Sequence, residues 1–390
     1  MWWLPFACTA TEPVEPSIVV TVEDVAQVVP SPGLPPEAAP NHANNNLDIA
    51  RFDGRLFLAF RTADTHFAGP EVRMVVVSSV DEVSWRYEGE VALGTDVREP
   101  QLVVIDGELR LYFTHLGDDS LDFEPGGVRM IRYQGPGAWT EPVDVFDAGY
   151  LAWRIKWMDG RLYAFGYSGG ENVYDDDGEP VIIEWLASED GSAWSAAFGD
   201  DPVVLSGGGS ESDGVWLDDG RLVAVVRNEA GDESGFGSKI CTAPADDPMA
   251  WDCAYDPRKY DSPLVIHELG AVWLVARRNV SDTGWYDLGR DDLPAAQQYG
   301  SYQLDYWQRP KRCALWRVDP DRREVSWVFD LPSNGDTCFP EAEPLGDGVW
   351  LLYNYSNDPD GPELTWIEGQ TGDTNIYRQI LRFREVTAIR

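Results

Sequence analysis

The chain contains 390 residues, and its 67 acidic and 30 basic side chains give a formal net charge of −37. Nucleic acids and anionic membranes bind basic surfaces, so this composition excludes both as expected partners. Apolar residues make up 43% of the chain, which is ample for the core of one large repeat fold.

The first forty residues differ in composition from the rest. Residues 1–8 are apolar and end in Cys8, and a stretch rich in Pro, Glu and Ala continues to about Pro40, which predicts a flexible tether. This order resembles the end of a bacterial lipoprotein signal, which implies an exported protein whose only membrane tether is a lipid on Cys8. A disordered apolar tail is the alternative. We expect residues 1–40 to hold the tail, the tether and one closing strand, and residues 41–390 to hold the folded domain.

Four further cysteines point to disulfides. Cys241 and Cys253 bracket a short predicted hairpin and would face each other across it, which leaves Cys313 and Cys338 as the other pair. Four cysteines allow three connectivities, and the sequence does not choose among them. Such bridges favour an extracellular, periplasmic or cell-surface location. The four histidines are scattered and no Cys-x-x-Cys occurs, so neither a metal nor another cofactor is expected.

A short sequence pattern occurs six times between residues 46 and 354. Each copy is an apolar strand, a turn and a second apolar strand, and five of the six turns contain Asp-Gly. Asp-Gly between apolar runs predicts a tight hairpin, because these residues accept the positive φ angles of such turns. The copies cover residues 46–61, 100–113, 153–167, 211–227, 262–277 and 339–354.

Each of the first five copies is followed by a second strand pair with a tryptophan entering its last strand. Four strands per unit and six units predict an all-β fold, a six-bladed β-propeller with four-stranded antiparallel blades. The sixth unit lacks one strand, which residues 17–22 would supply to close the ring. We expect little helix, because no apolar period of 3.6 residues is sustained over three turns. Two long connections, residues 279–312 and 356–375, interrupt the pattern, and loops of that length are usually functional.

Charged residues recur at the start of each first strand and at the end of each second strand. The innermost strands of a propeller line a central channel, so we expect these residues to meet at one mouth of it. Arg forks suit a carboxylate or phosphate on a ligand, and neighbouring carboxylates suit acid–base work on a glycosidic bond. The alternative is that they pair with one another and tie the blades together. The candidates include Asp48, Arg98, Glu99, Arg154, Glu211, Arg227, Arg277, Arg278 and Glu341.

Two turn sequences are similar to the Asp box, a structural turn of sialidases and related propellers. They are residues 188–194 and, more weakly, residues 79–85. Residues 211–228 look like the sialidase segment in which a Glu opens one strand and an Arg closes its partner. The resemblance implies a sialidase-like propeller in which Glu211 takes the place of the Glu that assists a tyrosine nucleophile. It also implies that Arg227 belongs to a three-Arg clamp on the carboxylate of the substrate.

Two positions depart from the sialidase pattern. Residues 44–46 are Asn where that family has its first clamp Arg, and Phe339 stands where it has the tyrosine. We therefore predict that a carboxylate pair replaces the tyrosine. The candidates for this pair are Glu211 and Glu341, with Asp48, Asp64 or Glu99 opposite.

Other residues are expected to bind the substrate. Arg98, Arg154 and Arg227 would hold it, and Arg277 or Arg278 would complete the clamp. His66 follows the first hairpin beside Asp64, in the region where the resemblance places an acid–base group. Tyr306, in the long connection, is either a displaced nucleophile or, as we favour, a stacking or packing residue.

These observations predict an exo-acting glycoside hydrolase that acts on an acidic or polyhydroxylated sugar. The expected partner is a carbohydrate or glycoconjugate, and the expected state is a monomer. The alternative is a non-catalytic carbohydrate- or protein-binding propeller, which the missing tyrosine favours. The acidic run at residues 175–177 suits either a calcium site or, as we favour, a solvated turn.

Overall fold

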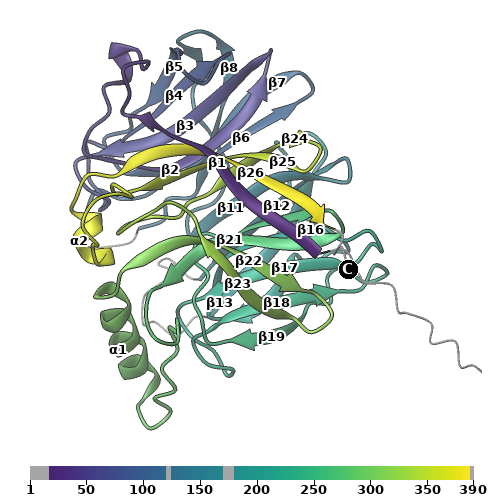
Figure 1. Cartoon of the computed structure of the whole chain (residues 1–390). Coiled ribbons are helices and arrows are strands. Elements are labelled where there is room, and N and C mark those ends of the chain that lie inside the picture. The colour runs from purple at the N-terminus through teal and green to yellow at the C-terminus, as the bar shows by residue number, and fades with distance from the viewer. Residues whose placement is uncertain (1–16, 120–123, 170–179, 387–390) are drawn as a thin grey trace, which may run out of the picture.

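The computed structural model describes residues 17–119, 124–169 and 180–386. Six antiparallel sheets make up this part of the chain, one for each predicted unit (Figure 1). The predicted six-bladed β-propeller with four-stranded antiparallel blades is therefore confirmed. Cys8 and the acidic run at residues 175–177 lie outside the described residues.

The first three blades follow the chain from the inner strand outward. The second and third blades have an outermost strand that is broken into two short pieces. The strands of the first blade are β2 (Ala43–Phe52), β3 (Arg55–Ala63), β4 (Arg73–Ser79) and β5 (Trp85–Val91). Those of the second are β6 (Val97–Ile105), β7 (Glu108–His115), β8 (Val128–Gly135), β9 (Ala138–Trp139) and β10 (Val143–Phe146). Those of the third are β11 (Tyr150–Met158), β12 (Arg161–Ser168), β13 (Val181–Ser188), β14 (Ser195–Ala196) and β15 (Val203–Gly207).

The remaining three blades continue in the same order. The fourth contains β16 (Gly209–Trp216), β17 (Leu222–Asn228), β18 (Ser238–Ala243) and β19 (Asp252–Asp256). The fifth contains β20 (Leu264–Glu268), β21 (Ala271–Asn279), β22 (Lys311–Asp319) and β23 (Glu324–Asp330). The sixth contains β24 (Glu341–Gly346), β25 (Val349–Ser356) and β26 (Asn375–Val386), together with β1 (Ser17–Val29) from the other end of the chain.

Strand β1 is the outermost strand of the sixth blade. It pairs antiparallel with β26 from Ser17 opposite Val386 to Val29 opposite Ile376, and Figure 1 shows the two strands side by side. The expectation of a flexible tether up to Pro40 does not describe residues 17–40. Instead β1 is followed by a short 3-10 helix, Pro36–Ala38, whose Ala38 is fully buried. Valines alternate with polar residues in β1, as is typical of a strand with one buried face. Its backbone pairs with the otherwise open edge of β26, which explains why this segment is ordered.

The hairpin turns take the conformation that Asp-Gly favours. Asp53, Asp106, Asp159 and Asp347 all have positive φ angles between 48° and 53°, and the glycine after each is also positive. Two successive positive φ angles give the turn the twist of the flanking strands. The fifth turn has Leu269 in the same conformation, at a φ of 53°, without the short polar side chain that tolerates it.

Side chains in the inner strands link neighbouring blades. Asp48 accepts a hydrogen bond from the backbone N–H of Ile49 and another from that of Leu102 in the next blade. Asp213 does the same between β16 and β20, where the N–H of Val265 donates to it at 2.6 Å. Burial raises the pKa of Asp48 to about 7. Each of its carboxylate oxygens accepts a hydrogen bond from the backbone, so Asp48 ties the first blade to the second.

Two helices occur in the long connections. Helix α1 (Ala295–Trp307) lies between β21 and β22, and α2 (Trp366–Gln370) lies between β25 and β26. The expectation of little helix is confirmed for the described residues, although the sequence pattern did not indicate α1. Its inward face is made by polar aromatic residues and one amide at i, i+3, i+4 and i+7, namely Tyr299, Tyr302, Gln303 and Tyr306. A search for aliphatic periodicity misses such a stripe. No helix in the described ranges is long and apolar enough to cross a membrane.

Two disulfides join the cysteine pairs that the sequence suggested. Cys241 and Cys253 are opposite each other on β18 and β19, and Cys313 of β22 is bonded to Cys338. The second bridge connects the fifth blade to the segment that leads into β24. Disulfides form and persist in oxidising compartments, so these bonds are consistent with an extracellular protein.

The two turns that resemble Asp boxes have one geometry. Asp190 accepts hydrogen bonds from the backbone N–H groups of Ser192 and Ala193, and Ser188 donates to the carbonyl of Ala193 at 2.6 Å. Asp81 and Ser79 make the corresponding contacts in the first blade. Each motif therefore closes its own turn and contributes no side chain to the channel.

Candidate functional site

A cavity of about 400 Å³ lies at the mouth of the channel where the inner strands begin. Its wall comes from the starts of β2, β6, β11 and β16 and from the ends of β12, β17, β21 and β25, as the hairpin pattern predicts. Helices α1 and α2 lie next to each other on one side of the propeller (Figure 1). Both contribute side chains to the lining of the mouth. Tyr299, Gln303 and Trp307 of α1 and Trp366 and Gln370 of α2 belong to its lining.

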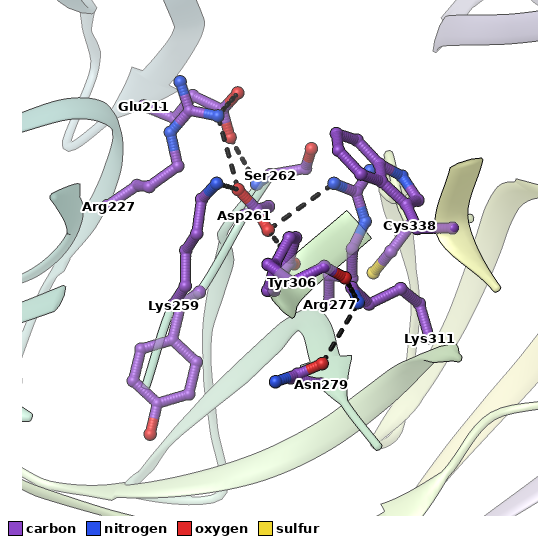
Figure 2. A network of polar contacts seen from close by, with 12 residues as sticks. Glu211, Arg227, Lys259, Asp261, Ser262, Arg277, Asn279, Tyr306, Lys311 and Cys338 are labelled. Carbon is purple, nitrogen blue, oxygen red and sulfur yellow. Dashed lines mark hydrogen bonds and ion pairs between the residues drawn. The ribbon is translucent and has the colours of Figure 1, made fainter. Parts of the chain in front are cut away.

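Arg227 is the centre of the charged network on one side of the cavity. Its Nη1 atom lies 2.8 Å from Oε1 of Glu211, 3.1 Å from Oε2 of Glu229 and 3.3 Å from Oδ1 of Asp261. Figure 2 shows the guanidinium beside Glu211, with Asp261 reaching it from below. Lys259 partly balances the three carboxylates, because its Nζ atom lies 2.7 Å from Glu229. These groups are almost fully buried, so each depends on the others for compensation of its charge.

Asp261 connects this network to α1. Its carboxylate accepts a hydrogen bond from the Tyr306 hydroxyl, and it lies 3.5 Å from Nη1 of Arg277 and 3.5 Å from Nζ of Lys259. Burial alone would raise the pKa of Asp261, but the cations Lys259, Arg277 and Arg227 hold it well below its usual range. Asp261 is therefore ionised, and its charge helps to fix the positions of three cavity cations and of α1.

Lys311 holds the C-terminal end of the same helix. Its Nζ atom donates to the side chain of Asn279 at 3.0 Å and to the carbonyl oxygens of Tyr306 and Arg309, at the end of α1 (Figure 2). Burial lowers the pKa of Lys311 to about 6. The last carbonyl groups of a helix lack intrahelical partners, so the hydrogen bonds that this lysine donates hold α1 against the fifth blade.

Glu99 lies in the same cavity with fewer partners. Its carboxylate accepts a hydrogen bond from the side chain of Asn46 at 3.0 Å. Burial raises its pKa to about 7, Arg98 opposes that rise, and the charge of Glu211 adds to it. Glu99 and Glu211 are thus close enough to affect each other's ionisation, and Glu99 is protonated over part of the neutral pH range.

His66 is held in the cavity wall by Asp336. The Nδ1 atom of His66 lies 2.6 Å from Oδ2 of Asp336, whose other oxygen accepts hydrogen bonds from the Tyr355 hydroxyl at 2.9 Å and the Trp366 indole at 3.0 Å. Burial lowers the pKa of His66, although Asp336 opposes the effect. A neutral imidazole bound at Nδ1 presents Nε2 as its remaining polar atom.

Six of the residues predicted for the site line this cavity. They are Arg98, Glu99, Glu211, Arg227, Arg277 and His66. Arg98 is paired with Asp96, and Arg277 donates to the carbonyl of Thr337 at 2.6 Å.

The other six predicted residues lie elsewhere. Asp48, Arg154 and Glu341 line a smaller cavity of about 270 Å³ farther along the channel, where Arg154 and Glu341 form an ion pair. Asp64 is exposed and accepts a hydrogen bond from Asn41, while Arg278 forms two hydrogen bonds with Asp330 on β23. Tyr306 is buried against Asp261 and does not belong to the cavity lining.

Sequence reasoning missed several residues of the cavity. Tyr355 ends β25, so the rule that selected Arg227 and Arg277 at the ends of second strands would have selected it too. Glu229 comes one position after the end of β17 and Lys259 comes five positions before β20, and neither carries such a signal. Trp366 lines the cavity, and Asp336 lies behind its wall; both belong to connections, whose positions no periodic pattern predicts. In the part of the chain described, no group of three or more His, Cys, Asp or Glu side chains is arranged to hold a metal ion.

Comparisons with known proteins extend the fold assignment. No protein-family model and no curated protein matches this chain. A solved structure of a Dyadobacter fermentans protein of unknown function shares 14% identity over 88% of this chain and 95% of its own, with a TM-score of 0.58. Trypanosoma rangeli sialidase shares 15% identity over 87% of this chain and 55% of its own, with a TM-score of 0.56. The chain has the propeller fold of the sialidase-like structures.

A second glycoside hydrolase has the same architecture. The α-L-arabinanase of Penicillium chrysogenum, solved with arabinobiose, shares 11% identity over 93% of this chain and 98% of its own, with a TM-score of 0.51. The sialidase match spans only about half of that enzyme's length, whereas the arabinanase match spans nearly all of it. At such identities the sialidase-like fold is shared, and the chemistry has to be argued from the cavity itself.

Proposed function

We propose that the chain is an exo-acting glycoside hydrolase that removes a terminal polyhydroxylated or acidic sugar by means of a carboxylate pair. The observation that carries the proposal is the presence of Glu99 and Glu211 in one partly covered cavity, with the pKa of Glu99 raised to about 7. Glycosidic bond cleavage needs one protonated and one ionised carboxyl group on either side of the bond. Both solved hydrolases named above have this fold, which supports a carbohydrate as the ligand.

The two glutamates have different environments that suit different roles. Glu99 is the proposed acid, because a protonated carboxyl with a pKa near neutrality transfers its proton to the leaving oxygen efficiently. Glu211 is the proposed base or nucleophile. Burial raises its pKa as well, but the contact with Arg227 and the hydrogen bond from the Ser262 N–H, at 2.6 Å, favour its ionised form.

The cavity is better suited to hydroxyl groups than to a strongly charged ligand. Arg98, Arg227 and Arg277 each lie beside a carboxylate of the protein. A ligand carboxylate would have to compete with those partners, whereas sugar hydroxyls can accept from a guanidinium and donate to a carboxylate in the same pair. We therefore favour the polyhydroxylated substrate, and the covered mouth favours attack at a chain end.

The experiment is a panel of aryl glycosides, including arabinosides, sialosides and uronides, tested on the wild type and on Glu99→Gln and Glu211→Gln. We expect turnover of at least one neutral glycoside and a loss of about 10²-fold or more in kcat for both variants. Glu343→Gln is the matched control, since burial also raises the pKa of Glu343 but this residue lines the smaller cavity. An unchanged rate in both cavity variants would refute the assignment.

A non-catalytic carbohydrate-binding propeller is the second candidate. The observation that favours it is the ion pairing of Glu211, Glu229 and Asp261 around Arg227, which is also what a purely structural network requires. Saturable sugar binding without turnover on any glycoside of the panel would support this candidate over the hydrolase. Export to the cell exterior, a lipid on Cys8 and a monomeric state remain part of the proposal.

A further inference from the structure

A second and larger cavity, of about 980 Å³, lies at the opposite mouth of the channel. It is lined by the ends of β11, β16, β20 and β24 and by the starts of β12 and β25. The first cavity is lined by the other ends of β11, β12, β16 and β25. The two cavities are therefore separated by the length of the inner strands, and the carboxylates of the first do not reach the second.

Three tryptophans from three different blades surround this second cavity. They are Trp157 on β11, Trp216 on β16 and Trp350 on β25. The Trp157 side chain, 45% exposed, donates its indole N–H to the carbonyl of Val104 at 3.0 Å, and Trp350 donates its own to Glu268 at 2.8 Å. These bonds fix two of the rings and leave their carbon faces for contact.

One polar atom in the lining has no partner. The indole nitrogen of Trp216 is buried and makes no hydrogen bond in the described residues. Because this nitrogen is inaccessible, Trp216 offers the cavity the carbon surface of its ring and no hydrogen-bond donor. Tyr163 and Phe198 pack against this ring and hold it in place.

The charged residues of the lining are largely neutralised by the protein. Lys156 lies 2.7 Å from Asp213, Glu341 is paired with Arg154, and the His267 ring is near Asp218, at 3.9 Å. A ligand with a net charge would have to displace these partners, whereas an uncharged ligand would not. Aromatic faces together with a few polar groups around a cavity of this size are typical of a small-molecule site.

We propose that this second mouth is a binding site for neutral oligosaccharides. The carbon faces of Trp157 and Trp350 would pack against the C–H faces of sugar rings, and the polar rim would bind hydroxyl groups. A site with separate aromatic platforms suits several linked sugars better than one small molecule. The inference does not depend on hydrolysis at the first cavity, since it rests on other residues.

The test uses the full chain and four probes: xylohexaose, arabinohexaose, cellohexaose and a hexamer of galacturonic acid. Tryptophan fluorescence and calorimetry would report binding, and hydroxyl-radical footprinting would report which tryptophans the ligand protects. We expect at least one neutral hexamer to bind and to protect Trp157, and the acidic hexamer to bind at least tenfold more weakly. Trp157→Ala and Trp350→Ala should each weaken binding at least tenfold.

The control variant is Trp327→Ala. Trp327 is 54% exposed and lies on the outer strand β23, where it contacts the guanidinium of Arg278 and does not line the second cavity. Trp157→Phe keeps an aromatic face and should retain most of the affinity, which separates loss of a platform from loss of folding. The proposal is overturned if no neutral hexamer binds, if binding survives in both alanine variants, or if the acidic hexamer binds equally well.

Discussion

Asp336 binds the imidazole of His66 at 2.6 Å although 270 residues separate them in the chain. The contact joins the loop after the first hairpin to the segment that enters the sixth blade, so it forms only when the ring is complete. Tyr355 and Trp366 donate to the second oxygen of the same carboxylate. One buried charge thus positions a histidine, a tyrosine and a tryptophan of the cavity wall.

Replacement of Asp336 by Asn is expected to destabilise the protein strongly. Although burial works against the charge of Asp336, its contacts with His66 and Arg277 hold its pKa below the usual range, so its stabilising effect is present at neutral pH and is lost as the pH falls toward acid values. The amide cannot accept as many hydrogen bonds and leaves Arg277 less well compensated. We expect a loss of about 3–5 kcal/mol in the free energy of unfolding, measured with urea at neutral pH.

The comparison for this variant is Asp330→Asn. Asp330 also accepts two hydrogen bonds from an arginine, but its side chain is 26% exposed. A partly exposed ion pair contributes about 1 kcal/mol, so this variant should lose clearly less stability than Asp336→Asn. Equal losses in the two variants would contradict the role given to Asp336.

Glu99 should make the protein less stable as the pH rises. Its pKa is about 7 in the folded chain against 4.5 ordinarily, so the fold favours the protonated form, and that contribution is complete below about pH 4.5 and lost as the pH rises through 7. The Glu99→Gln side chain cannot ionise, so this variant does not lose that contribution. Between pH 4.5 and 7 and above, the free energy of unfolding of the wild type should fall by about 3 kcal/mol relative to that of the variant. Urea unfolding at a series of pH values would measure the difference.

Glu229 provides a comparison of opposite sign. Burial opposes its charge, but Arg227 and Lys259 lower its pKa, so its stabilising effect is lost as the pH falls. Glu229→Gln should therefore be most destabilising at neutral pH and should approach the wild type in acid. If both variants followed the same pH trend, the assigned environments would be wrong.

Leu269→Asn should stabilise the chain by about 0.5–1 kcal/mol. Leu269 has a φ of 53° in the one hairpin turn of the inner strands that lacks a short polar residue there, and its side chain is 37% exposed. A left-handed conformation costs a leucine about 1–2 kcal/mol, and asparagine tolerates it better. Thermal unfolding would detect the gain, and Asp106→Leu, at a φ of 52°, should show a loss of similar size.

The two disulfides should differ in their accessibility to reductant. Cys313 and Cys338 are both fully buried, whereas Cys253 is only partly buried. Thiol–disulfide exchange needs direct access to a sulfur atom, so the Cys241–Cys253 bond should be reduced first under native conditions. Alkylation followed by mass spectrometry would show the order, and labelling of Cys313 before Cys253 would contradict it.

Local chemistry in the sequence determined the fold. Five Asp-Gly turns between apolar strands, at a spacing that allows four strands per unit, set the number and type of blades because the turn conformation and strand alternation are local properties. The same pattern indicated which ends of the strands face one mouth. It therefore selected Glu99, Glu211, Arg227 and Arg277 as neighbours.

Tertiary structure decided the partners and surroundings of those residues. Asp48 and Arg154 occupy similar strand positions but lie farther along the channel. Asp48 accepts a hydrogen bond from the Leu102 N–H, and Arg154 binds the Pro340 carbonyl and Glu341. Trp366 in the cavity lining and Asp336 behind it belong to connections, whose path no periodic pattern describes. The pKa of Glu99 depends on burial and on Glu211, which lies in another blade, and such a value exists only once the ring has closed.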